Sequence, residues 1–175
     1  MKTNSRLRYF LYLSILIVGC TTGKNALQKG NYDASVFKAV DRLKSSPKNT
    51  EAMQVLTSAY NLALQMHFRN IDEAKLSSDV LRWETVLANY QKINQLSDEI
   101  NACPTCLTLI PDPKRYLQEE EDSKFKAAEV RYALGIKQLN ENNRISAKNA
   151  YFNFEKANYF YPNYKDVKTK MDDAY

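Results

Sequence analysis

The sequence predicts an all-α protein. Its 175 residues include only four glycines and five prolines, so few positions favour a turn or interrupt a helix. Apolar residues recur at intervals of three and four over most of the chain, which is the spacing of one helix face. Charged residues make up 26% of the chain and hydrophobic residues 44%. These proportions are typical of a folded domain with a core and exclude global disorder.

The first 20 residues have the pattern of an export signal. Lys2, Arg6 and Arg8 precede an apolar run over 9–18, which is too short to cross a bilayer as a helix. The run ends in Ile17-Val18-Gly19-Cys20, which resembles a bacterial lipobox. The resemblance implies that residues 1–19 are removed and that Cys20 carries a diacylglycerol and an acyl chain.

A lipidated Cys20 would leave residues 20–24 as a short tether between the membrane and the folded domain. Thr21 follows the cysteine, as in lipoproteins that are sent to the outer membrane of Gram-negative bacteria, and this resemblance implies the same location in the cell envelope. A plain signal peptide or an N-terminal membrane anchor with an unrelated cysteine is the alternative.

Residues 25–175 are expected to form one helical domain. After a short turn at 26–29, Asn31 is expected to cap a helix that ends at Pro47. A second helix is predicted from Asn49 to about Ala74. A third follows from an Asp79 cap to Ile100.

The proline-rich segment 101–113 divides the domain, because Pro104, Pro111 and Pro113 block helical hydrogen bonds. We expect it to be an irregular loop. A fourth helix is predicted from Lys114 to about 139, a fifth from the polar turn 140–144 to Pro162, and a last amphipathic segment over 164–175.

Two parts of the chain resemble tetratricopeptide repeats, and a third matches the start of one. The second half has the small and aromatic residues of such a repeat at matching intervals, with one insertion in the turn: Leu134-Gly135, Ala150, Phe154, Ala157 and Pro162. The first half has a more degenerate set: Gly30-Asn31-Tyr32, Ser35, Leu43 and Pro47, with Arg42 in place of a small residue. Trp83 to Tyr90 also matches the start of a repeat, except that Val86-Leu87 replaces Leu-Gly.

The repeat resemblance implies antiparallel helix pairs that stack as a short right-handed solenoid. An unrelated antiparallel helical bundle would show the same periodicity and remains the alternative. The lipobox and the repeats together resemble helical lipoproteins that are common in Bacteroidetes-type bacteria.

Cys103 and Cys106 enclose Pro104-Thr105 in a C-x-x-C motif. In an oxidising envelope, with Cys20 lipidated, these two cysteines form an even pair, which favours a local disulfide. The other interpretations are a thiol redox site, a free thiol pair and a zinc site, and zinc would need about four ligands where only His67 is a further candidate.

The sequence predicts no catalytic site. His67, the only histidine, has no sequence partner that indicates general-base chemistry, and we expect it to pack in a helix. No phosphate-binding loop or metal-binding motif is present, and we expect neither a cofactor, other than the lipid, nor a metal. The net charge of +5 falls to +2 without the three cationic residues of the signal, so nucleic acid is not an expected partner.

The aromatic residues near the C-terminus are too many for one buried stripe. Ala150, Phe154, Ala157 and Tyr161 share a face and are expected in the core. The candidate partner-binding residues are those expected on other faces: Phe152, Tyr159, Phe160 and Tyr164. The alternative is that these rings cover a neighbouring helix.

These features together favour a non-enzymatic envelope lipoprotein that acts as a protein-binding scaffold or assembly factor. Its expected partners are another envelope protein and, through the lipid, the membrane. The first alternative is a ligand-binding lipoprotein of a surface nutrient-uptake system. The second is a thiol redox protein that uses Cys103 and Cys106.

Overall fold

The structure is a computed structural model that describes residues 22–175, so the predicted signal, the lipobox and Cys20 lie outside the described part. Within this part the chain is all-helical, as predicted, and has no strand. The eight helices are α2 (Lys24–Gln28), α3 (Tyr32–Ser45), α4 (Thr50–Leu76), α5 (Arg82–Asn101), α6 (Pro104–Leu109), α7 (Leu117–Leu139), α8 (Arg144–Phe160) and α9 (Val167–Asp173).

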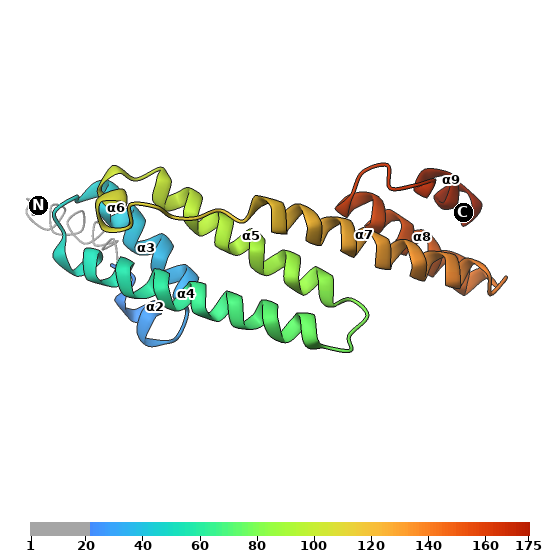
Figure 1. Ribbon diagram of the computed structural model, residues 1–175, viewed down its shortest axis with the longest axis horizontal. Helices are drawn as coiled ribbons and strands as arrows, with labels where there is room; N and C mark the ends of the chain where they lie inside the picture. Colours follow the sequence, from blue (N-terminus) through green and yellow to red (C-terminus); the bar gives the residue numbers. More distant parts are fainter. Residues whose placement is uncertain (1–21) are drawn as a thin grey trace, which may run out of the picture.

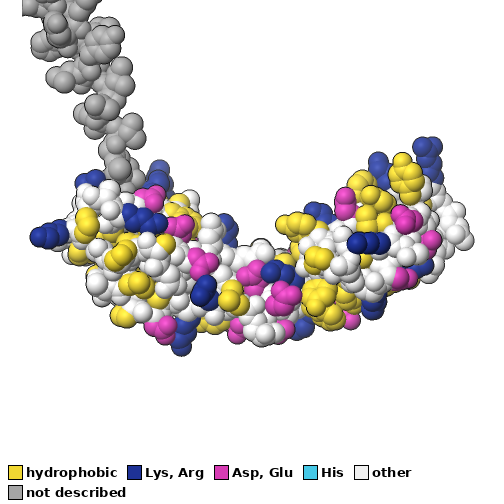
Figure 2. Space-filling view, turned by 90° about the horizontal axis from the view of Figure 1, so that it is seen from above, with side chains coloured by type: hydrophobic (Ala, Val, Ile, Leu, Met, Phe, Trp, Pro, Cys, Tyr) yellow, Lys and Arg dark blue, Asp and Glu magenta, His cyan; other side chains and the backbone are white. Residues whose placement is uncertain are grey.

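The long helices pack in chain order. Helix α3 lies against α4, α4 against α5, α5 against α7, and α7 against α8, which α9 then covers. Figure 1 shows that the first group, α2 to α6, and the second group, α7 to α9, occupy opposite ends of an elongated molecule. From above, the molecule is a crescent with a hollow near its middle (Figure 2). This order fits a helical bundle and also a short solenoid.

The buried side chains form three clusters along the molecule rather than one central core. The first joins α3 and α4 to the end of α5 and to α6. The second lies between the last part of α4 and the first part of α5. The third is enclosed by α7, α8 and α9. Each group of helices therefore has its own apolar interior, and α5 connects them through its contact with α7.

The closest helix contact joins α7 to α8. Phe154 is fully buried, and a Cβ atom on Gly135 would lie only 2.6 Å from its ring. Ala150 and Ala157, on the same face of α8 as Phe154, are also fully buried. The small residues and the ring thus pack together as the intervals in the sequence led us to expect.

Asparagine side chains cap three of the helices. Asn31, Asn49 and Asn143 each accept a hydrogen bond from the backbone N–H three residues later. The caps at Asn31 and Asn49 are at predicted positions. Helix α5, however, begins at Arg82 rather than just after Asp79, because the Asp79 carboxylate accepts from the Leu81 N–H and holds a turn before the helix.

The segment 101–113 is not wholly irregular, as we had expected, because it contains the short helix α6. Pro104 occupies the first turn, where its missing N–H costs no helical hydrogen bond. The Cys106 N–H points to Cys103 Sγ at 3.2 Å. Helix α7 begins at Leu117, later than Lys114, because the Tyr116 N–H donates to Asn94 Oδ1 on α5 at 2.6 Å.

No helix within residues 22–175 is both long and apolar enough to cross a membrane.

Candidate functional site: a groove between α5, α7 and α8

The four aromatic residues proposed for partner binding differ in exposure. Tyr159 is 74% exposed and Phe152 49%, while Phe160 is half-buried. Tyr164 is only 4% exposed, and its ring packs edge-on against Phe125 and Tyr132. The expectation for Tyr164 is therefore corrected: it belongs to the core between α7 and α9, because the turn after α8 folds it back.

The remaining three aromatic residues line two different hollows along α8. Tyr159 and Phe160, at the end of the helix, line a groove against α5. Phe152, two turns earlier, lines a hollow beside Tyr151 and Tyr175. The sequence could not make this separation, because it depends on which element lies beside each part of α8.

The groove, which we call the α5–α8 groove, has a volume of ≈ 400 Å³. Three helices contribute to it, and its lining residues are Glu84, Leu87, Ala88, Gln91, Lys124, Tyr159 and Phe160. The four residues from α5 recur at intervals of three and four, so they form one continuous face of that helix. The start of α5 and the end of α8 lie near the middle of the long axis (Figure 1).

The charged groups at the groove are paired within the chain. Lys124 Nζ lies 2.9 Å from Glu120 and 3.5 Å from Glu121. The hydrogen bond to Glu120 raises the pKa of Lys124. Burial raises the pKa of Glu120, but the bonds from Lys124 and Asn94 together hold it below its ordinary value. Both groups therefore stay charged at neutral pH and neutralise each other.

Arg131 holds α5 and α8 in place on either side of α7. Its guanidinium donates to Glu84 on α5, at the groove, and to Asn153 on α8 at 2.9 Å. Asn153 is buried and donates in turn to Gln138 on α7 at 2.7 Å. This polar chain fixes the width of the groove. Its members are far apart in sequence, so periodicity gave no signal for it.

The acidic run 119–122 is only partly paired with the lysines of α7. Glu120 pairs with Lys124, which lies four residues later on the same side of the helix. Lys126, four residues after Asp122, lies instead 4.1 Å from the centre of the Trp83 ring on α5. A cation over the face of an indole is attracted by the ring quadrupole, so Lys126 joins α7 to α5.

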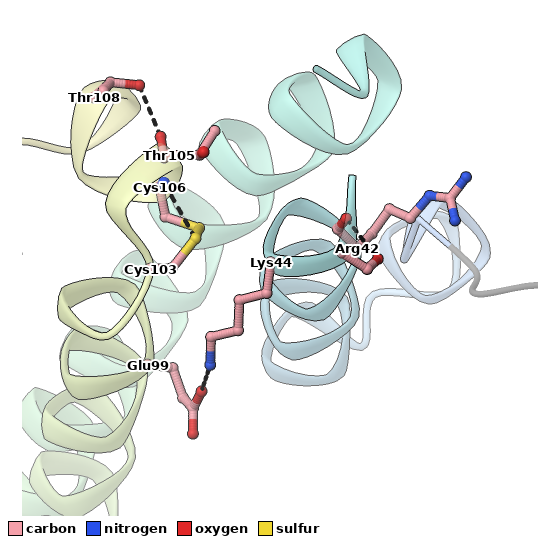
Figure 3. Close-up of a disulfide and its surroundings, with 8 residues drawn as sticks. Arg42, Lys44, Glu99, Cys103, Thr105, Cys106 and Thr108 are labelled. Carbon is pink, nitrogen blue, oxygen red and sulfur yellow. Dashed lines mark hydrogen bonds and ion pairs between the residues drawn. A yellow bond between two sulfur atoms is a disulfide. The ribbon is translucent and has the colours of Figure 1, made fainter. Parts of the chain in front are cut away.

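Cys103 and Cys106 form a disulfide, with their sulfur atoms 2.06 Å apart. Figure 3 shows it at the junction of α5 and α6, close to the ion pair between Lys44 of α3 and Glu99 of α5. Both cysteines are buried. A buried disulfide offers no sulfur to an attacking thiol, so this geometry favours a structural pin over redox exchange.

His67 is buried and bridges three helices. Its Nδ1 lies 2.8 Å from Asn89 Oδ1 on α5, and its Nε2 lies 2.9 Å from Asp33 Oδ1 on α3. Asn89 donates its own Nδ2 to the Thr85 carbonyl, which leaves its oxygen to face the imidazole. With both ring nitrogens occupied, His67 has none free to act on a substrate. Its role as a buried polar bridge was missed in the sequence, where no partner lies nearby.

The described residues contain no group of three or more histidine, cysteine and acidic side chains that could hold a metal ion.

Comparisons with known proteins give no relative for this chain. No protein family, no curated protein and no solved structure matches it.

Proposed function

We propose that this chain is a non-enzymatic envelope lipoprotein that binds a segment of another envelope protein in the α5–α8 groove. The observation that carries the proposal is the pair Tyr159 and Phe160, which stand over the apolar floor made by Leu87 and Ala88. Aromatic rings beside a hollow are typical anchors of protein interfaces.

The charge arrangement of the groove indicates what it accepts. Because Lys124 and Glu84 are already paired with groups of the chain, a charged side chain entering the groove would gain no unpaired partner there and would lose its hydration. An apolar side chain would bury its surface against the rings and the α5 face. The groove therefore suits a partner segment whose central anchor is apolar.

The membrane part of the proposal rests on the motif Ile17-Val18-Gly19-Cys20. A lipid on Cys20 would attach the helical domain through a few residues only, so the domain would act close to the membrane surface. Thr21 favours the outer membrane as the site of attachment.

The test is photocrosslinking in living cells from a benzophenone amino acid placed at Tyr159 or Phe160, with mass identification of the adducts. We expect one dominant envelope protein from both positions, and its loss when Ala88→Arg fills the floor of the groove. The same probe at Asn149, an exposed residue of α8 that lines neither the groove nor the hollow beside Phe152, is the matched control and should give no such adduct.

Two results would contradict the proposal. One is the absence of any protein adduct from both groove positions. The other is an adduct that Ala88→Arg leaves unchanged. Retention of a Cys20→Ala variant in the membrane fraction would contradict the lipid attachment alone.

A cavity of ≈ 400 Å³ is also within the size range of small-molecule sites. This size favours the ligand-binding lipoprotein as the second candidate. It predicts that the groove positions give no protein adduct and that Ala88→Arg instead abolishes uptake of a nutrient.

A further inference from the structure

A second hollow lies between α8 and the C-terminal residues, away from the α5–α8 groove. We call it the terminal face. Its volume is ≈ 330 Å³, and its lining residues are Arg144, Ala147, Lys148, Tyr151, Phe152, Ala174 and Tyr175. Phe152 is 49% exposed and Tyr175 fully exposed. The face is therefore both apolar and open.

The terminal face carries two cations without an acidic partner in the described chain. Arg144 and Lys148 are four residues apart and lie on the same side of α8. Neither forms an ion pair with a residue of 22–175, and Lys148 only lies near the Phe152 ring at 5.8 Å. No acidic residue lines the hollow. A segment that matches the terminal face in charge and polarity would carry both acidic residues and exposed apolar residues.

The chain itself carries such a segment at the start of α7. The four acidic residues 119–122 lie between Leu117, which is 56% exposed, and Phe125, which is 43% exposed. Glu119 and Asp122 pair with no cation within residues 22–175. Leu117, Glu121 and Phe125 follow one another at four-residue intervals and share a side of the helix, with Asp122 next to it and Glu119 on the opposite side. The Glu121 side chain is 54% exposed and lies 3.5 Å from Lys124.

We propose that the terminal face of one copy receives the start of α7 from a second copy. Arg144 and Lys148 would meet Glu121 and Asp122, and Phe152 and Tyr175 would cover Leu117 and Phe125. The two surfaces lie toward opposite ends of the second group of helices, α7 to α9. A rise of 1.5 Å per helical residue places them about 25 Å apart. When the α7–α9 groups of two copies lie side by side in opposite directions, the same contact can form twice, which closes a two-fold dimer.

This inference is independent of the α5–α8 groove, because the two sites share no residue. Failure of one proposal leaves the other in place.

The first test uses the full chain in detergent, mixed in equal amounts with ¹⁵N-labelled chain and treated with a zero-length carbodiimide crosslinker. Such a reagent joins a lysine to a carboxylate only where the two are in contact. We expect mixed-isotope peptide pairs that join Lys148 to residues 119–122. Lys156, an exposed lysine of α8 outside the terminal face, is the matched control and should give none.

The second test is a charge exchange followed by sedimentation equilibrium. Lys148→Glu combined with Arg144→Glu should weaken dimerisation about tenfold or more, and so should Glu121→Lys combined with Asp122→Lys. In a mixture of the two variants, the heterodimer should regain both contacts, one with the original charges and one with the charges exchanged. Lys156→Glu should have no effect.

Three results would overturn the proposal: a monomer at all concentrations, mixed-isotope pairs that involve Lys156 as often as Lys148, or a dimer whose affinity neither charge reversal changes.

Discussion

At the scale of single residues, the protonation of His67 is the least expected feature. Both ring nitrogens face oxygen atoms, those of Asn89 and Asp33. An acceptor at each nitrogen is satisfied only by the imidazolium, which has two N–H donors. Burial lowers the pKa of His67, but the hydrogen bonds to Asp33 and Asn89 outweigh both this and the nearby charge of Lys92, so the net effect is a pKa above the ordinary 6.5.

The raised pKa of His67 predicts a stability that falls with rising pH. The folded chain holds this proton more tightly than the unfolded chain, so the contribution is fully present below about pH 6.5 and disappears as the pH rises through the folded-state pKa. Urea unfolding at pH 6 and pH 9 should show a lower free energy of unfolding at pH 9. In His67→Gln, which cannot titrate, that part of the difference should be absent. An equal pH dependence in both proteins would contradict the assignment.

Gly135 is the second residue whose role the structure specifies. Gly135→Ala should lower the free energy of unfolding by about 1–3 kcal/mol, because the new methyl group would overlap the fully buried ring of Phe154. Helix propensity alone would instead raise it by about 1 kcal/mol. Urea denaturation gives the sign directly.

A double-mutant cycle with Phe154→Leu is the control for Gly135. The smaller side chain makes room for the methyl group, so the double variant should lose less stability than the two single variants added together. Strict additivity would show that the two residues do not share this space.

At the scale of elements, α6 is the helix that depends most on a covalent bond. It has only six residues, too few to be stable by its own hydrogen bonds. The disulfide at its start and its contacts with α3, α4 and α5 keep it in place. We therefore expect it to be the first element to loosen when the disulfide is removed.

Replacing Cys103 and Cys106 together by alanine should lower the free energy of unfolding by about 2 kcal/mol, the chain-entropy value for so short a loop. The measurement is urea denaturation with and without a reductant. The reductant should destabilise the unmodified protein and should have no effect on the variant. The crosslinks from Tyr159 should persist in the variant. Their loss, without loss of the fold, would favour the thiol redox alternative.

At the scale of the whole molecule, the contact between α5 and α7 decides the crescent shape. The buried side chains form three clusters along the molecule, and Tyr116, which directly precedes α7, packs on Phe68 of α4 and Tyr90 of α5. Polar groups contribute to the same junction: buried Asn94 accepts from the Tyr116 N–H and donates to Glu120 at 2.8 Å. Ser97 donates to the Lys114 carbonyl at 2.7 Å.

Asn94→Ala should therefore weaken the junction between the two halves. We expect a loss of about 1–3 kcal/mol in the free energy of unfolding, because the buried Tyr116 N–H and Glu120 lose a partner. Hydrogen exchange should become faster at residues 116–122, while α8 keeps its protection. Asn149→Ala, on the exposed side of α8, is the control and should change neither quantity. Equal acceleration in α8 would indicate that the halves unfold as one unit.

The sequence by itself determined the local structure of this protein. A helix and its ends depend on residues within one or two turns, such as the asparagine caps and Pro47. The predicted ends of the two helices within 32–76 therefore lie within about two residues of the observed ones. The contact between Gly135 of α7 and Phe154 of α8 could also be expected from the sequence, because the two residues stand at the interval found in a tetratricopeptide repeat. The disulfide was favoured because Cys103 and Cys106 form an even pair in an oxidising compartment once Cys20 is lipidated.

Only the tertiary structure decided which surfaces are free. Tyr164 and Tyr159 are both tyrosines near the end of a helix, yet one is buried by the turn that follows α8 and the other stands over the groove. The pKa of His67 is raised by its hydrogen bonds to Asp33 and Asn89, which lie 34 and 22 residues away. Burial and electrostatic environment come from chain segments that meet only in three dimensions, and no pattern of neighbouring residues contains them.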